Sequence, residues 1–261
     1  MKVYIFTDME GISGISGSDF VLTDGRCYAQ GCRYMTWDIN ACARGCFNGG
    51  ATAVVARDGH GGGNNVIWSE VDPRVELVQG AGGPRRFPGF EDADAVILLG
   101  YHAMAGVRGA VLEHTYSSKH VQNLWLNGKL VGELGVDAAV AGELGKPVIM
   151  ASGDDALCAE ARAWIPQALT CQVKTSFATQ GSCLLPKDAA HRLIEETAAA
   201  AVRRAASIEP LRVTKPVTMR LEVIERGGIP GGPGRPDLKV LDGRTVETTA
   251  DSVEAALRRL W

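Results

Sequence analysis

Residues 1–11, MKVYIFTDMEG, combine a short apolar run with two carboxylates. The run from Val3 to Phe6 is typical of a buried strand in a parallel sheet. Asp8 and Glu10 follow it two residues apart, and side chains at that spacing in an extended chain point to the same side. Two like charges held close together repel unless a cation or a shared proton lies between them. Taken alone, this pair fits a metal site and a pair of solvated loop acids equally well.

Two later strand patterns end in the same way. Residues 52–56 form an apolar run that leads to Asp58 and His60 among glycines, and residues 93–100 form the strongest strand pattern and lead to His102. In open α/β sheets, ligands bind beyond the carboxyl ends of the strands, which lie along one edge. We therefore expect four side chains to converge at that edge: Asp8, Glu10, His60 and His102.

The alternation of predicted strands and helices through about residue 175 favours an α/β fold, with a mainly parallel sheet flanked by helices and a smaller C-terminal α+β lobe. Asn127-Gly128 is the favoured pair for a type I′ turn and predicts a hairpin over residues 122–131. The predicted helices are residues 26–48, 133–144, 154–164, 186–206 and 252–261. We expect residues 1–180 to form the metal-binding catalytic domain. Residues 181–261 are predicted to form a long helix and the smaller lobe, continuous with it.

Composition excludes several classes of protein. The chain has 261 residues, of which 46% are hydrophobic, and a formal net charge of −3, which suits a soluble protein of one main domain. It has no basic run for nucleic acid and no apolar run long enough to cross a membrane. The first residues lack the pattern of a signal peptide, so we expect a cytoplasmic protein. Cys32, Cys42 and Cys46 follow helical spacing and are interpreted as core residues rather than zinc ligands.

Imidazole and carboxylate together form a ligand set for zinc, and manganese or iron would also fit it. A single catalytic zinc usually takes three protein ligands, whereas this chain offers four candidates, or five with Glu133 at the start of a predicted helix. This surplus suits two metal ions bridged by a carboxylate and a hydroxide. Asp8, nearest the strand end, is the candidate for the bridging carboxylate.

Each residue also has a simpler interpretation. His60 fits an ordinary loop residue, His102 fits a core histidine bonded to the backbone, and Glu133 fits an acid that stabilises the positive end of its helix. His114 and His120 lie in the loop after the third strand, where a general acid or an oxyanion donor would be useful. The recurrence of polar residues at three strand ends favours the metal site.

Five motifs resemble the D-aminopeptidase (DppA) family of dinuclear zinc peptidases. They are TDMEG at 7–11, DGH at 58–60, GYH at 100–102, EHT at 113–115 and VGELG at 131–135, and the resemblance covers about residues 1–175. It implies that the two zinc ions are held by Asp8, Glu10, His60, His102 and Glu133. The catalytic histidine of the family corresponds to His114, with His120 as the alternative. The resemblance also implies a short peptide substrate and a homodecamer of stacked rings with active sites facing an inner chamber.

We therefore expect a metal-dependent aminopeptidase that hydrolyses N-terminal D-amino acids from short peptides or amino-acid amides through a zinc-activated water. Mn²⁺ or Co²⁺ are the expected substitutes for zinc. Asp58 is interpreted as an acid that orients a histidine rather than as a ligand. Two alternatives remain, namely another dinuclear hydrolase such as a phosphoesterase, and a metal-binding protein without catalysis.

Overall fold

A sheet of six parallel strands forms the centre of the fold, in the order β3-β2-β1-β4-β7-β8. The computed structural model describes residues 1–81, 83, 85–230 and 234–261. The six strands are β1 (Lys2–Thr7), β2 (Ala53–Asp58), β3 (Val75–Val78), β4 (Ala95–Leu99), β7 (Val148–Gly153) and β8 (Leu169–Gln172). Strand β1 pairs with β2 on one side and with β4 on the other, so the strand order reverses next to β1. Such a reversal opens a crevice beyond the strand ends.

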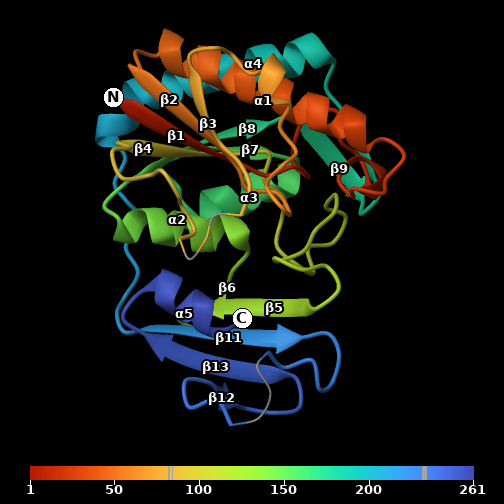
Figure 1. Cartoon of the computed structure of the whole chain (residues 1–261), viewed down its shortest axis with the longest axis vertical. Helices are drawn as coiled ribbons and strands as arrows, with labels where there is room; N and C mark the ends of the chain where they lie inside the picture. Colours follow the sequence, from red (N-terminus) through yellow and green to blue (C-terminus); the bar gives the residue numbers. More distant parts are fainter. Residues whose placement is uncertain (82, 84, 231–233) are drawn as a thin grey trace.

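Helices cover both faces of this sheet, which confirms the predicted α/β fold (Figure 1). Helices α1 (Tyr28–Asn48) and α4 (Lys187–Arg204) pack against each other on one face, and α2 (Glu133–Glu143) and α3 (Asp155–Trp164) lie on the other. The inner side of α1 buries the cysteines at positions 32, 42 and 46, as their helical spacing predicts. The described residues also form short 3₁₀ helices at Ser18–Phe20, Trp68–Glu70 and Ala205–Ser207.

A second, antiparallel sheet has the strand order β12-β13-β11-β5-β6. Its strands are β5 (Val121–Leu126), β6 (Lys129–Leu130), β11 (Val217–Val223), β12 (Lys239–Val240) and β13 (Thr245–Ala250). Helix α5 (Val253–Arg259) packs on β11 and β13 and contacts α2, so it lies between the two parts of the fold (Figure 1). The hairpin of β5 and β6 turns at Asn127 and Gly128, whose φ values are 48° and 81°, as a type I′ turn requires.

The chain passes between the two sheets more than once. Strands β5 and β6 come from the first half of the chain but belong to the second sheet, while α4 follows residue 180 and packs on the first. The division at residue 180 therefore stays a prediction. A further hairpin pairs β9 (Lys174–Ala178) with β10 (Gly181–Leu184).

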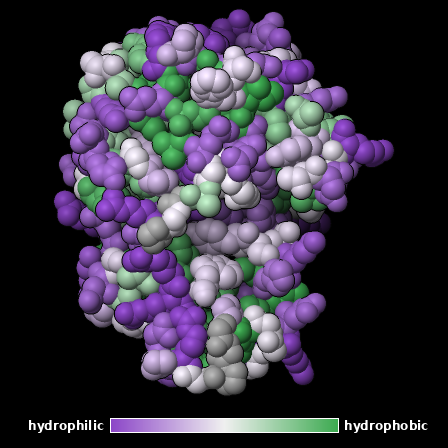
Figure 2. Space-filling model, in the orientation of Figure 1, coloured by the Kyte–Doolittle hydropathy of each residue, from purple (hydrophilic) through white to green (hydrophobic). Residues whose placement is uncertain are grey.

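The face of the molecule shown in Figure 2 mixes hydrophilic and hydrophobic residues. Among the described helices, none has both the length and the apolar character needed to cross a membrane. Of the large hydrophobic side chains in the described part of the chain, Trp68 and Phe177 are the most exposed, at 77% and 70%.

Candidate metal centre

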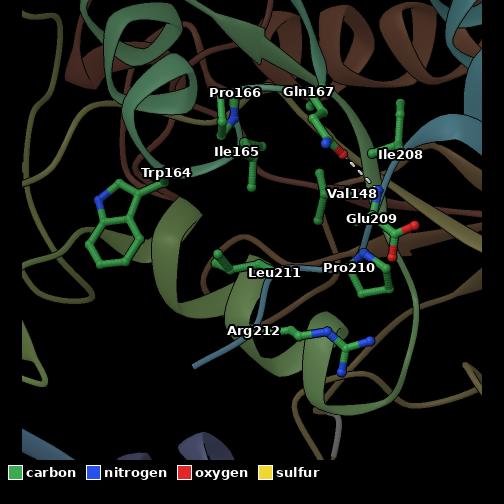
Figure 3. A pocket seen from close by; sticks show the side chains of 11 residues that line it. Val148, Trp164, Ile165, Pro166, Gln167, Ile208, Glu209, Pro210, Leu211 and Arg212 are labelled. Carbon is green, nitrogen blue, oxygen red and sulfur yellow. Dashed lines mark hydrogen bonds between the residues drawn. The ribbon is translucent and has the colours of Figure 1, made fainter. Parts of the chain in front are cut away.

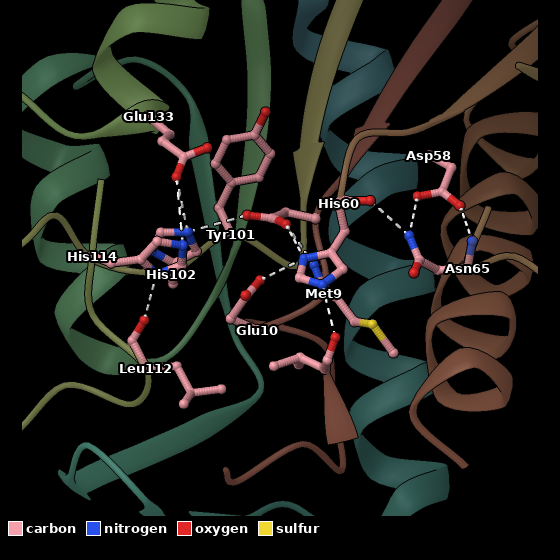
Figure 4. Close-up of polar contacts among 12 residues, drawn as sticks. Met9, Glu10, Asp58, His60, Asn65, Tyr101, His102, Leu112, His114 and Glu133 are labelled. Carbon is pink, nitrogen blue, oxygen red and sulfur yellow. Dashed lines mark hydrogen bonds and ion pairs between the residues drawn. The ribbon is translucent and has the colours of Figure 1, made fainter. Parts of the chain in front are cut away.

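Six acidic and imidazole side chains meet beyond the carboxyl ends of β1, β2 and β4 (Figure 4). They are Asp8 and Glu10 after β1, His60 after β2, His102 and His114 after β4, and Glu133 as the first residue of α2. A hydrogen bond joins the carboxyl ends of β1 and β4: the amide of Asp8, which follows β1, donates to the carbonyl of Leu99, the last residue of β4, at 2.9 Å. The site thus lies where the strand order reverses, the place that the strand-end residues predict.

Glycine makes this close approach possible at one point. A Cβ atom at Gly11 would lie 1.8 Å from the Tyr101 carbonyl oxygen, so a larger residue would force the exit of β1 away from the exit of β4. The Gly11 amide donates to the Gly100 carbonyl at 2.8 Å. The TDMEG motif therefore places its acids next to His102 through backbone contact.

The first group of side chains contains Asp8, Glu10 and His60. His60 Nδ1 lies 3.2 Å from Asp8 Oδ1 and 3.2 Å from Glu10 Oε2. Its other ring nitrogen, Nε2, donates to the Val21 carbonyl at 3.0 Å. Nδ1 is therefore the ring nitrogen that is available to coordinate a metal ion. Burial lowers the pKa of His60, but Glu10 and Asp8 outweigh burial and raise that pKa to about 12. Without a cation, the two carboxylates would thus hold a proton on this imidazole.

The second group contains His102, His114 and Glu133, and Asp8 reaches it as well. His102 Nε2 lies 3.2 Å from Asp8 Oδ2 and 3.3 Å from Glu133 Oε1. His102 Nδ1 donates to the Ala103 carbonyl at 3.1 Å, so Nε2 faces the acids. The Tyr116 amide donates to Glu133 Oε1 at 2.8 Å and fixes that carboxylate. Asp8 therefore turns one oxygen toward each group.

The donor atoms of this site fit divalent cations. Glu10 Oε2 and His102 Nε2 are buried and have no hydrogen-bond partner of suitable geometry among the described residues. Within each group of three residues, one candidate ligand atom per residue lies within 4.8 Å of the others. A buried polar atom without a partner is costly, and three buried carboxylates this close together repel one another. Divalent cations coordinated by these oxygens and nitrogens would remove both penalties.

His114 and His120 lie in different environments. The ring of His114 stacks on His102 with centroids 3.9 Å apart and an angle of 9° between the planes, and its Nε2 lies 3.9 Å from Glu133 Oε1. Its Nδ1 donates to the Leu112 carbonyl at 2.8 Å. His120 is exposed and contacts the Ser117 hydroxyl at 2.9 Å. The structure brings His114 to the site and leaves His120 at the surface.

Asp58 is buried next to the site but contacts no histidine ring among the residues that the structure describes. Its carboxylate accepts hydrogen bonds from the amides of Asn65 and Val66, at 2.5 and 3.1 Å, and from the Asn65 side chain at 2.9 Å. The Asn65 side chain also donates to the His60 carbonyl at 2.8 Å. Asp58 therefore holds the loop that carries His60, rather than the imidazole itself.

Sequence patterns did not identify two basic residues that lie near the site, Lys174 and Arg86. The Lys174 ammonium is buried and donates to the carbonyls of Glu10, Ile12 and Ile15, at 2.6, 2.9 and 2.7 Å. Arg86 forms a two-bond ion pair with Asp137, at 2.7 and 2.8 Å, and its Nη2 lies 3.8 Å from Glu133 Oε2. For Lys174, the one available signal in the sequence was a lysine within a strand pattern. Arg86 lies in an irregular glycine- and proline-rich stretch, which carries no signal of a functional residue.

A cavity of about 630 Å³ opens beside this cluster. Asp8, Glu10, His60, His114 and Glu133 all line it, so a small peptide could reach the cluster from this side. A second cavity, of about 280 Å³, lies at the opposite edge of the sheet, around Val148 at the start of β7 (Figure 3). Its lining is mainly apolar and contains no cluster of candidate ligands among the described residues.

Comparison with known proteins places this arrangement in a family. The family model described as D-aminopeptidase (peptidase family M55) matches residues 1–261. The chain belongs to this D-aminopeptidase family. A family relative, the D-aminopeptidase of Bacillus subtilis (strain 168), is 36% identical over 214 residues, which cover 81% of this chain and 77% of the relative. The predicted family is thereby confirmed.

A solved structure of the same family has a very similar fold. It is described as "Zn-dependent D-aminopeptidase DppA from Bacillus subtilis, a self-compartmentalizing protease". The two chains superpose with a TM-score of 0.93 at 31% identity, and the match covers 99% of this chain and 94% of the other. The similarity therefore extends through the second sheet and α5, beyond the motifs of the first 175 residues.

Proposed function

We propose that this protein is a zinc-dependent aminopeptidase that removes N-terminal D-amino acids from short peptides and amino-acid amides. The observation that carries this proposal is the convergence of three carboxylates and three imidazoles beyond three parallel strands, in a chain of the D-aminopeptidase family. The zinc dependence of the similar solved structure supports the choice of metal.

The side chains divide naturally into two ligand sets that share Asp8. Glu10 and His60 would hold one zinc ion with Asp8 Oδ1, and His102 and Glu133 would hold the other with Asp8 Oδ2. The count of two rests on this division and on the surplus of ligands over the three that a single catalytic zinc usually takes. Mn²⁺ or Co²⁺ would be accepted in the same positions.

When bound, zinc supplies a Lewis acid that polarises a carbonyl group and lowers the pKa of a water molecule. The remaining task is proton transfer, for which His114 is placed. Because Nδ1 donates to the Leu112 carbonyl, Nε2 is the atom that accepts and returns a proton. Its side chain is 16% exposed and lines the cavity, so Nε2 could reach the nitrogen of the leaving amine. His114 is farther from Glu133 than His102 is, which favours this role over that of a ligand.

Assembly into a homodecamer with enclosed active sites is the oligomeric state that we propose. It is supported by the description of the similar structure as self-compartmentalizing and by the near-complete overlap of the two chains. Native mass spectrometry should give the mass of ten chains, and a monomer at micromolar concentration would contradict the proposal. A cytoplasmic location stays a prediction.

The function is tested by metal analysis together with a substrate panel. We expect the purified protein to contain zinc and to hydrolyse D-aminoacyl amides faster than their L-enantiomers, with activity lost on chelation and restored by zinc. Hydrolysis of phosphate esters but not of amides would support a phosphoesterase instead. Normal zinc content without hydrolysis of any amide, ester or phosphate would indicate a metal-binding protein without catalysis.

A further inference from the structure

Arg57 is a buried cation that has no ion-pair partner among the residues that the structure describes. It is the penultimate residue of β2, pairs in register with Phe6 of β1, and is only 8% exposed. Its Nε and Nη1 atoms are buried without a hydrogen-bond partner among the described residues. A guanidinium stays charged at any physiological pH, and a buried charge is costly unless it is paired. An anion bound beside the guanidinium would offset this cost.

Arg57 lines a cavity of about 400 Å³ that is rich in arginine. Arg85, Arg86 and Arg258 line it as well, and Glu254 is the one acid among its described lining residues. Arg85 pairs with Glu91 and Arg86 pairs with Asp137, whereas Arg57 and Arg258 have no ion-pair partner within the described part of the chain. Two unpaired arginines in one cavity favour the binding of a carboxylate or a phosphate.

This cavity adjoins the metal centre. Gly59, Gly61 and Arg86 line both it and the cavity beside the cluster. Arg57 is three residues before His60, so the Cα atoms of these two residues are at most about 11 Å apart. An extended di- or tripeptide spans roughly 7–11 Å, so its two ends could lie at the metal centre and at Arg57 at the same time. A free inorganic anion would gain nothing from this proximity.

We propose that this arginine cavity binds the C-terminal carboxylate of a short peptide whose N-terminal residue lies at the metal centre, with Arg57 and Arg258 as the donors. The inference rests on the proposed peptidase function and assigns the side chains that hold the free carboxylate of its short peptide substrate. The cavity limits peptide length because a longer peptide would place its carboxylate beyond these arginines.

The test compares D-alanyl-glycine with D-alanyl-glycinamide, which differ only in the terminal charge. Charge-assisted hydrogen bonds of this kind predict a kcat/KM at least roughly tenfold higher for the acid than for the amide. In Arg57→Met and Arg258→Met the ratio should fall to about threefold or less, mainly through a higher KM for the acid. Arg226→Met, an exposed arginine away from the cavity, is the matched control and should keep the ratio.

Using the ratio within each variant separates binding from folding, because a partly misfolded preparation loses both activities together. If Arg57→Met does not fold, Arg258→Met still tests the inference, because Arg258 is exposed and its replacement should not affect folding. Equal rates on acid and amide in the unmodified protein would overturn the inference while leaving the aminopeptidase function intact. Hydrolysis of neither compound, nor of any other aminoacyl amide, would instead contradict the proposed function.

A second arm distinguishes the carboxylate from inorganic phosphate. Inhibition by phosphate that disappears in Arg57→Met, together with no preference for the acid, would show that the cavity binds free phosphate and would overturn the assignment to substrate. Preference for the acid that depends on Arg57 and Arg258 supports it, whether or not phosphate competes.

Discussion

Asp8 lies between the two ligand groups, with Oδ1 facing His60 and Oδ2 facing His102, both at 3.2 Å. Its two oxygens point in these directions partly because Oδ1 also accepts the Met9 amide at 2.9 Å. If Asp8 bridges two ions, its loss should affect both, whereas the loss of a ligand from one group should spare the other.

Asp8→Ala should therefore lose nearly all zinc, while His60→Ala should keep about one zinc ion per chain of the proposed two. Zinc content is measured by mass spectrometry of the metal after gel filtration. Asn65→Ala, which removes a contact to the His60 loop but no ligand, is the control for indirect effects. Equal zinc loss in Asp8→Ala and His60→Ala would argue against a bridging role.

His114→Ala should bind zinc normally but lose turnover by about 10²–10⁴-fold, the usual contribution of a general acid or base. The matched control is His120→Ala, because His120 is exposed and the hydrogen bond of its ring goes to the Ser117 hydroxyl, away from the cluster. Steady-state kinetics on a D-aminoacyl amide, with zinc measured in the same samples, would check both. A large loss in His120→Ala and none in His114→Ala would reverse the assignment.

At the scale of elements, strand β9 stabilises the loop after β1. Lys174, its first residue, reaches across to three carbonyls between Glu10 and Ile15. Ser13 on the same loop bonds through its amide and hydroxyl to Asp38 of α1. The loop that carries Glu10 is thus held from two sides, by β9 and by the long helix α1.

Lys174→Met should lower stability by on the order of 3 kcal/mol, because three buried carbonyls lose their donor and methionine replaces only the stem. The melting temperature should fall by about 6–12 °C in a protein of this size. Lys239→Met, at an exposed position of β12, is the control and should melt within about 1–2 °C of the unmodified protein. An unchanged melting temperature for Lys174→Met would show that solvent replaces the ammonium without cost.

At the scale of the whole molecule, burial should make the fold sensitive to alkaline pH. Burial is the largest cause that raises the pKa of Cys158 and of Cys171 from 9.0 to about 12. The folded protein then keeps protons that the unfolded chain releases above pH 9. These groups contribute their full stability below pH 9, and that contribution is lost as pH rises from about 9 toward 12.

Each buried thiol should cost about 1.4 kcal/mol of stability by pH 10 relative to neutral pH. Denaturant unfolding at pH 7.5, 9 and 10 would measure the decline. It should be shallower in the double variant Cys158→Ala with Cys171→Ala, and unchanged in Cys183→Ala, whose cysteine is exposed. The same slope in the double variant as in the unmodified protein would contradict the assignment.

Local sequence patterns were sufficient for most elements of the α/β part. The apolar runs over residues 3–6, 52–56 and 93–100 correspond to β1, β2 and β4. The helix predicted over residues 26–48 corresponds to α1. The hairpin of β9 and β10 was not predicted, because its short strands are half exposed and lack a long apolar run. The pairing of β5 with β11 was also beyond local patterns, since these strands are about a hundred residues apart.

The sequence by itself determined the parallel sheet, the five candidate metal ligands and the family, because these depend on short-range periodicity and on motifs at strand ends. Only the tertiary structure decided that His114 rather than His120 faces the cluster, and that Asp58 supports a loop instead of a histidine ring. It also revealed Arg57, a buried cation without an ion-pair partner among the described residues, close to the candidate metal centre. Those outcomes depend on contacts between segments distant along the chain, whose distances and directions no local pattern encodes.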